Sequence, residues 1–172
     1  ALGLPGVQEA LVEAIVGTGT PTVLVLIDGR PLSLPWIAEH VPSILLAWLP
    51  GEEGGTAIAD VLFGDVPPGG KLPVSIPRSV GQVPVYYGHK PSGGRSQWKG
   101  DYVDLSAKPL FPFGHGLSYS RFEYANLALS SPEIPPTGTM DVCLEVTNTG
   151  SCPGEEVVQL YVHDVIASVT RP

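Results

Sequence analysis

Thr22-Val-Leu-Val-Leu-Ile-Asp28 is the stretch that decides the fold class of the first part of this chain. A continuous run of Val, Leu and Ile is typical of a strand that is buried on both faces of a parallel sheet. Ser43-Ile-Leu-Leu-Ala-Trp-Leu49 has the same character and predicts a second strand. Between the two runs, Leu34–Val41 predicts a short helix with Ser33 as its N-cap and Pro35 in its first turn.

Two further helices are predicted on either side of this segment. Gly6–Val16 has apolar residues at helical spacing, which form one stripe: Val7, Ala10, Leu11, Ala14 and Ile15. Glu52–Phe63 predicts the other helix, because its acidic start suits a positive helix N-terminus, and Gly64 ends it. Alternating strands and helices indicate an α/β layer structure. Two parallel strands do not form a stable sheet alone, so we expect missing strands before Ala1 or an associated partner.

The chain changes character after this α/β part. Residues 65–118 are rich in Pro and Gly, lack clear periodicity and predict an unusually long loop region. Beyond it, Phe122–Leu129, Asp141–Thr147 and Glu155–Asp164 alternate between apolar and polar residues, which predicts strands of an antiparallel sandwich. Residues 148–154 predict the turn between the last two strands. Because a sandwich of this kind needs about seven strands, we expect the chain to be cut at both ends.

Composition excludes several classes of function. The 172 residues include 21 Gly and 19 Pro, but 43% are apolar and 15% are charged, so the chain can bury a core and is not disordered throughout. The net charge of -8 and the scattered Lys and Arg residues argue against nucleic-acid binding. No apolar run reaches the roughly 18 residues of a membrane span, so no membrane partner is expected. The start lacks the basic residues of a signal peptide, and Met140 is the only Met, so we expect the chain to begin inside a longer or processed polypeptide.

Cys143 and Cys152 cannot by themselves build a disulfide framework or a zinc site. In the predicted hairpin Cys143 lies opposite a residue near Gln159, and Cys152 lies in the turn, so their pairing is not expected. Two free thiols favour a reducing, cytoplasmic compartment. The sequence has no HExxH or CxxC motif, so neither a metal nor another cofactor is expected.

Two pairs of carboxylates could supply the acid and the nucleophile of a hydrolase. Glu52 and Glu53 form one pair, for which the alternative is a helix N-terminus that faces water. Asp101 and Asp104 form the other pair, for which the alternative is a loop structured by hydrogen bonds to Asp side chains. These alternatives are the interpretations that we favour.

His89–Tyr102 is the most unusual part of the long loop, because it concentrates charged and aromatic residues in a chain with few charges. Trp and Tyr rings stack on the apolar faces of sugars, and charged side chains hydrogen-bond sugar hydroxyls. The alternative is a loop that packs on a neighbouring domain through its aromatic rings. The substrate-binding candidates are His89, Lys90, Arg95, Trp98, Asp101 and Tyr102.

Several strings, in this order and spacing, resemble glycoside hydrolase family 3, the family of β-glucosidases and β-xylosidases. They are Leu2-Gly-Leu-Pro-Gly-Val-Gln-Glu-Ala-Leu-Val12, Pro50-Gly-Glu-Glu-Gly-Gly55, Ala59-Asp-Val-Leu-Phe-Gly-Asp-Val66 with Gly70-Lys-Leu-Pro-Val74, Pro112-Phe-Gly-His-Gly-Leu-Ser-Tyr119 with Phe122-Glu-Tyr124, and Asn148-Thr-Gly150 with Glu156-Val-Val-Gln-Leu-Tyr-Val162. Each string is weakly specific, but the five together are highly specific and span nearly the whole chain. The loop 89–102 is most similar to the bacterial branch of the family.

The resemblance implies three successive domains in the parent enzyme: a barrel, an α/β sandwich and a fibronectin-III-like β-sandwich. Residues 1–118 resemble the second half of the α/β sandwich with the long loop 65–118, and residues 119–172 resemble the first strands of the third domain. The family is retaining, with an Asp nucleophile on the barrel and, in most members, a Glu acid/base before the segment that matches Leu2–Val12. Neither position exists here, so no catalytic residue is expected in this chain.

We therefore expect a C-terminal fragment of an exo-acting β-glucosidase or β-xylosidase, which supplies domain packing and one wall of the sugar site. A non-catalytic scaffold or interaction module is one alternative. A stand-alone hydrolase that pairs Asp101 with Glu52 or Glu53 is another. Because uncovered edges at Val23–Ile27 and Ile44–Leu49 invite strand pairing, we also expect self-association or dependence on a complementary fragment with the barrel. The loop 89–102 has few contacts of its own, so we expect it to open locally at low free energy.

Overall fold

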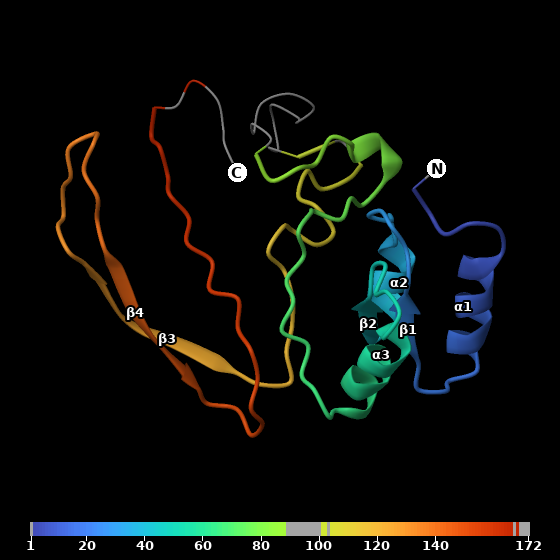
Figure 1. Ribbon diagram of the computed structural model, residues 1–172. Coiled ribbons are helices and arrows are strands. Elements are labelled where there is room, and N and C mark those ends of the chain that lie inside the picture. Colours follow the sequence, from blue (N-terminus) through green and yellow to red (C-terminus); the bar gives the residue numbers. More distant parts are fainter. Residues whose placement is uncertain (1, 89–100, 103, 167, 169–172) are drawn as a thin grey trace. The chain divides into compact units, whose positions relative to one another are not determined.

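The computed structural model describes residues 2–88, 101–102, 104–166 and 168 (Figure 1). The chain divides into two compact units. The first comprises Ala1–Ile58, Lys71–His115 and Gln159–Pro172, and the second comprises Ala59–Gly70 and Gly116–Val158.

The first unit contains a pair of parallel strands, as the sequence predicts. β1 (Val23–Leu26) pairs with β2 (Ser43–Leu46), and Leu26 lies opposite Leu46. The predicted second strand extends to Leu49, but β2 ends at Leu46, and Trp48 beyond it takes a φ of 52°, a left-handed backbone that departs from extended strand geometry.

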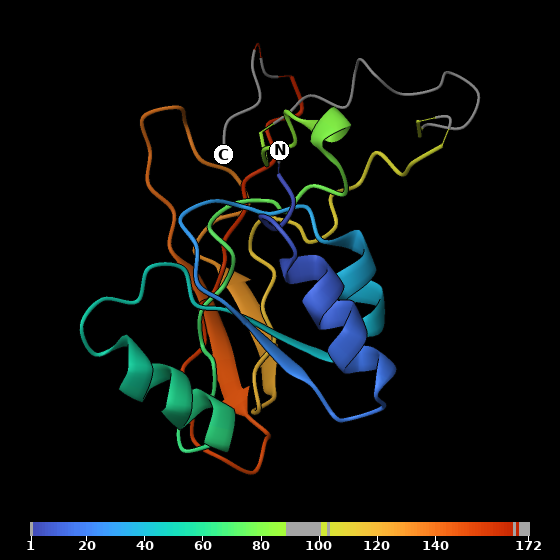
Figure 2. The same ribbon diagram turned by 90° about the vertical axis from the view of Figure 1, so that its right-hand side faces the viewer.

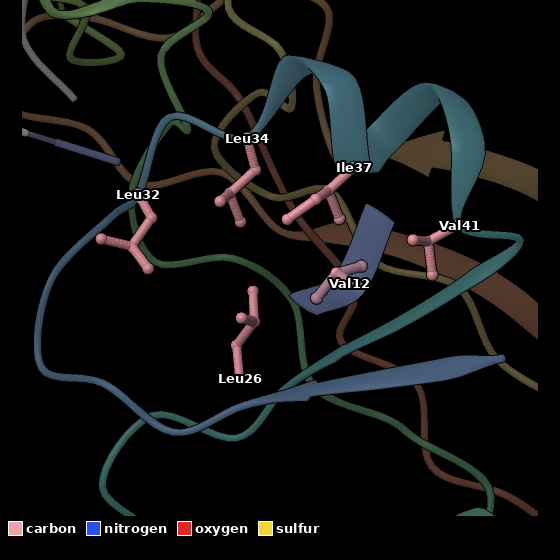
Figure 3. Packing of buried hydrophobic residues seen from close by; sticks show 6 residues of the cluster. All are labelled: Val12, Leu26, Leu32, Leu34, Ile37 and Val41. Carbon is pink, nitrogen blue, oxygen red and sulfur yellow. The ribbon is translucent and has the colours of Figure 1, made fainter. Parts of the chain in front are cut away.

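The hydrophobic core lies against one face of this strand pair (Figure 3). Its buried residues come from α1 (Gln8–Gly17), β1, α2 (Pro35–His40) and the segments beside α2: Val12, Leu26, Leu32, Leu34, Ile37 and Val41. Leu24, Ile44 and Leu46 pack against the cluster, and they share its face because side chains alternate along a strand. Figures 1 and 2 both place α1 next to α2.

The opposite face of β1 is only partly covered, because Val25 on that face is half-buried. Val23 is 53% exposed and the adjoining Ile27 is 61% exposed, so the prediction of a strand buried on both faces is wrong for this chain. A continuous apolar run predicts a strand with apolar residues packed on both of its faces. Among the residues that the structure describes, none packs closely enough on Val23 and Ile27 to bury them.

α1 differs from its prediction in the face that it buries. The predicted stripe is exposed at Val7, Leu11 and Ile15, whereas Val12 is buried and Val16 packs against the core. The helix carries apolar side chains on both faces, so periodicity alone identified the wrong one.

The start of α2 also differs from the prediction. Leu34, not Ser33, occupies the N-cap position, and no side chain caps the helix there. Ser33 instead donates a hydrogen bond from its Oγ to the carbonyl oxygen of Arg78, at 2.7 Å. The Ser33 hydroxyl, which the local sequence pattern predicts as a helix cap, is therefore used in a tertiary hydrogen bond. Pro35 lies in the first turn, as predicted.

α3 (Gly54–Phe63) begins two residues later than predicted, and Glu52 and Glu53 precede it as exposed side chains. Gly64 follows the helix with a φ of +86°, a conformation that glycine adopts without steric strain, so the predicted stop is confirmed. In the part of the chain that the structure describes, no helix has the length and hydropathy needed to cross a membrane.

The second unit contains an antiparallel pair formed by β3 (Phe122–Leu129) and β4 (Val142–Asn148). Both strands occur where the sequence predicts them. The register shifts between Ala125 and Ala128, where Asn126 has a φ of 53°, so the extra residues form a bulge. The Asn126 side chain donates a hydrogen bond to Glu145 Oε2 on the facing strand at 2.7 Å, which fixes the bulge.

The predicted strand at Glu155–Asp164 is wrong, because the structure assigns no strand there and β4 pairs with β3 instead. Cys143 accordingly lies opposite Ala128 and not near Gln159. Both cysteines are free thiols, as predicted; Cys143 is exposed and Cys152 is partly buried. The turn at residues 148–154 contacts the chain just before β3, where the Ser120 hydroxyl donates a hydrogen bond to the carbonyl oxygen of Cys152.

Ile37 provides a test of the core, because its side chain is 0% exposed. We expect Ile37→Ala to lower the free energy of unfolding by about 2–5 kcal/mol, from lost burial and the cavity left behind. The matched control is Ile15→Ala, the same truncation at a helical position that is 41% exposed. Urea denaturation monitored by circular dichroism would measure both. Equal losses in the two variants would show that the core is not centred on Ile37.

Tyr124 provides a test of the second unit. Its hydroxyl donates to Glu156 Oε1 at 2.9 Å. Desolvation, this hydrogen bond and the negative charge of Glu156 together raise the pKa of Tyr124 above the usual value of 10.0. Because the folded-state pKa is raised, the stabilisation is fully present below pH about 10 and is lost as the pH rises through the folded-state value.

We expect ultraviolet titration to show one phenol that ionises above the usual range and is absent from Tyr124→Phe. Glu156→Gln keeps an acceptor but removes the charge, so it should move this ionisation back towards 10.0, the unperturbed value. An unchanged titration in Glu156→Gln would contradict the assigned cause.

Candidate functional site

The described residues include two of the six substrate-binding candidates. Asp101 and Tyr102 are both partly buried. His89, Lys90, Arg95 and Trp98 lie outside the described residues. The two segments of the first unit that flank the loop 83–105 therefore define the candidate site.

These two flanking segments are joined by backbone hydrogen bonds. Ile76 and Phe111 form an antiparallel bridge, with the Ile76 N–H donating to the Phe111 carbonyl at 2.8 Å. Further along, the Leu72 N–H donates to His115 O and the Gly114 N–H donates to Leu72 O, each at 2.8 Å. A short ladder of this kind holds both ends of a long loop together without a regular sheet.

Ser75 adds a side-chain contact to this ladder. It is 8% exposed, and its Oγ accepts a hydrogen bond from the Phe113 N–H at 3.2 Å. Ile76 beside it is buried, and Pro77 is fully buried. Because buried backbone groups are costly to leave unpaired, a hydroxyl at this position satisfies a donor that the ladder misses.

Gln82 makes the most extensive polar contacts near the loop. It lies in the 3-10 helix η1 (Val80–Gln82) and is 3% exposed. Its Oε1 accepts from the Arg78 N–H at 2.7 Å, and its Nε2 donates to the carbonyl oxygens of Ser106, at 3.2 Å, and Lys108, at 2.9 Å. The Arg78 guanidinium Nε donates to the same Lys108 oxygen at 3.0 Å. One buried amide thus joins the segment before the loop to the segment after it.

Asp101 is connected to this network through the backbone. One of its carboxylate oxygens accepts a hydrogen bond from the Ala107 N–H, and Ala107 stands between the two residues whose carbonyls Gln82 binds. This bond agrees with the interpretation of Asp101 as a carboxylate that structures its own loop. Asp104, the other member of the predicted pair, is exposed.

Aromatic rings gather at the other end of the flanking segments. Tyr87 tilts against Phe113 with ring centroids 5.2 Å apart and against Tyr161 at 5.5 Å. Gln159 links this group to the chain, because its Nε2 donates to Gly114 O at 3.0 Å and its Oε1 accepts from Tyr161. The sequence assigned Gln159 and Tyr161 to a strand, whereas the structure uses their side chains to cover the ladder.

Asp28 is the one residue among those described whose side chain has a buried polar atom without a hydrogen bond. It follows β1, and its Oδ1 accepts from the Arg30 N–H at 3.0 Å while its Oδ2 is buried and unpaired. Sequence reasoning missed both Asp28 and Gln82. No spacing marks either residue, because the contacts of Gln82 are made far along the chain and the burial of Asp28 Oδ2 depends on the tertiary fold. Within the described residues, no group of three or more His, Cys, Asp or Glu is placed to hold a metal ion.

Comparison with known proteins identifies the protein family of this chain. The sequence model of the glycosyl hydrolase family 3 C-terminal domain matches residues 1–119. The chain therefore belongs to glycosyl hydrolase family 3.

Individual relatives extend over nearly the whole chain. A beta-xylosidase of Formosa agariphila is 55% identical over 170 residues, and a periplasmic beta-glucosidase of Salmonella typhimurium is 47% identical over 175 residues. These matches cover 99% and 98% of this chain but only 23% of each relative.

Solved structures agree with the sequence relatives. The β-glucosidase EmGH1 of Erythrobacter marinus superposes with a TM-score of 0.89 at 50% identity, over 99% of this chain and 22% of that one. A beta-glucosidase of Listeria innocua in complex with glucose gives a TM-score of 0.89 at 38% identity, over 99% of this chain and 25% of that one. The chain thus spans about a quarter of the length of the family members that it resembles.

Proposed function

We propose that this chain is the C-terminal part of a retaining β-glycosidase that releases glucose or xylose from β-linked substrates. The observation that carries the proposal is the extent of the matches: almost all of this chain aligns with only 22–25% of β-glucosidases and a β-xylosidase. The names of these relatives support both sugars, so the proposal includes both.

The chemistry of a retaining glycosidase defines what this part can contribute. Such hydrolysis needs two carboxyl groups about 5–5.5 Å apart, one as nucleophile and one as acid and base. Glu52 and Glu53 are exposed before α3, and Asp101 is engaged with the backbone of its own loop. None of them matches a catalytic position of the family. The proposed role is therefore to pack against the catalytic barrel and to form one wall of the sugar site.

We propose a division of the chain at residue 118. Residues 1–118 would complete an α/β sandwich, and residues 119–172 would begin a fibronectin-III-like sandwich. The end of the family match at residue 119 and the start of β3 at Phe122 support this division. The parallel pairing of β1 with β2 and the antiparallel pairing of β3 with β4 support the two sheet types.

The proposed sugar contacts are the six residues of the loop: His89, Lys90, Arg95, Trp98, Asp101 and Tyr102. The aromatic rings would stack on the apolar face of the sugar, and the charged groups would bind its hydroxyls. The ladder between residues 72–76 and 110–115, together with Gln82, supports this role because it gives the loop a fixed base.

Uncovered apolar surface supports the proposal that the chain functions against a larger partner. Leu11 on α1, Val23 on β1 and Ile27 just after β1 are all more than half exposed. Asp28 beside them carries a buried oxygen without a partner, and buried polar atoms in complete proteins are nearly always paired. The barrel-bearing part of the parent would cover the exposed apolar side chains. In its absence, a second copy of the chain would cover them through self-association.

The proposal is tested by activity. We expect the 172-residue chain alone to leave 4-nitrophenyl β-glucoside and β-xyloside unhydrolysed, because both catalytic carboxylates are absent. The parent polypeptide, with the reading frame extended upstream of Ala1 to a barrel, should hydrolyse at least one of them. Turnover by the short chain that survives repurification and disappears in Asp101→Asn would instead support a stand-alone hydrolase. An upstream frame without a barrel would overturn the proposal.

The sugar-site role of the loop is tested by Trp98→Ala in the parent enzyme. If the ring stacks on the substrate, KM should rise by about tenfold, equivalent to about 1.4 kcal/mol, while Tm changes little. The matched control is Trp36→Ala, because Trp36 packs against the core and should lower Tm without a comparable change in KM. A Trp98→Ala enzyme with unchanged KM and a Tm several degrees lower would show that the ring is a packing anchor.

A further inference from the structure

Gln82 satisfies three backbone groups with a single buried side chain. A primary amide offers one carbonyl oxygen and two N–H donors. Here the oxygen accepts from Arg78, and the nitrogen donates to Ser106 O and Lys108 O. The orientation of the amide is fixed by this arrangement, because a rotation by 180° would place its oxygen against two carbonyl oxygens.

The contacts of Gln82 continue to Asp101 in one further step. The two carbonyls that Gln82 binds flank Ala107, and the Ala107 N–H donates to a carboxylate oxygen of Asp101. The Ser106 side chain tightens the same segment, because its Oγ accepts from the Lys108 N–H at 3.2 Å. Residues 106–108 are therefore held on one side by a buried amide and hold a carboxylate on the other.

We propose that Gln82 is a positioning residue that fixes the direction of the Asp101 carboxylate towards a hydroxyl of the bound sugar. This inference rests on the proposed function, which places Asp101 among the sugar contacts. The Ala107 N–H engages one carboxylate oxygen, so the other oxygen is the one that accepts the hydroxyl hydrogen. A carboxylate whose orientation is fixed before binding loses less conformational entropy when the sugar arrives, which improves binding and not the chemical step.

The substitution that removes these contacts at nearly constant volume is Gln82→Met. Its matched control is Ser75→Ala, because Ser75 is also buried and also holds a backbone group at the base of the same loop, but its partner is Phe113 and not residues 106–108. Both variants should lower Tm. Only Gln82→Met should release the segment that holds Asp101.

The first measurement is amide hydrogen exchange at Ala107 in the 172-residue chain. We expect Gln82→Met to speed exchange at this amide by at least tenfold relative to the Ser75→Ala chain. If Gln82→Met does not fold, Gln82→Glu replaces it. A protonated carboxyl can still donate to one of the two carbonyls, whereas a carboxylate repels both, so protection of Ala107 should be lower at pH 7 than at pH 4. Equal protection of Ala107 in the substituted and control chains would overturn the inference.

The second measurement separates this inference from the proposed function, and it uses the parent enzyme. Asp101→Asn should raise KM several-fold with kcat within twofold. Gln82→Met should do the same, and the double variant should be no worse than Asp101→Asn alone. If Asp101→Asn leaves KM unchanged, the sugar-site assignment is wrong, whatever the exchange data show. If Asp101→Asn raises KM but Gln82→Met does not, or if the two effects multiply, Gln82 does not act through Asp101 and the inference fails.

Discussion

The apolar cluster between α1, α2 and the β1–β2 pair, which contains Ile37 of α2, is the interaction on which the first unit depends. Ile37 is fully buried, and the cluster also includes Val12 of α1, Leu26 of β1 and Val41 just after α2. Truncating such a residue removes buried surface and leaves a cavity that its neighbours fill only in part.

The core covers only one face of the sheet, and this explains much of the exposed surface. Leu24 and Leu26 point to the helices, whereas Val23 and Ile27 lie on the other face and are exposed. α1 shows the same division, with Val12 buried and Leu11 exposed. Exposed apolar surface of this kind is typical of a face that packs against another protein surface.

The long loop depends on a different kind of interaction. Regular secondary structure does not pair the backbone groups of residues 78 and 106–108, so Gln82 pairs them with its side chain. Ser75 does the same for Phe113. Buried polar side chains thus replace a sheet at the base of the loop. These hydrogen bonds fix the two ends of the loop that carries the candidate sugar contacts, although the segment is rich in Gly and Pro.

The sequence by itself determined the family, the order of the three helices α1–α3 and the four strands β1–β4, the parallel and antiparallel strand types and the free state of both thiols, although it also predicted a strand at Glu155–Asp164 that does not form. These features depend on local periodicity, on glycine at a helix end such as Gly64 and on motifs that are contiguous in the chain. Only the tertiary structure decided which face of α1 is buried, because both faces are apolar. It also decided that Ser33 bonds to Arg78 instead of capping α2, and that β4 pairs with β3 and not with the segment after it. The role of Gln82 had no local signal, because its partners in residues 106–108 lie more than twenty residues away in the sequence.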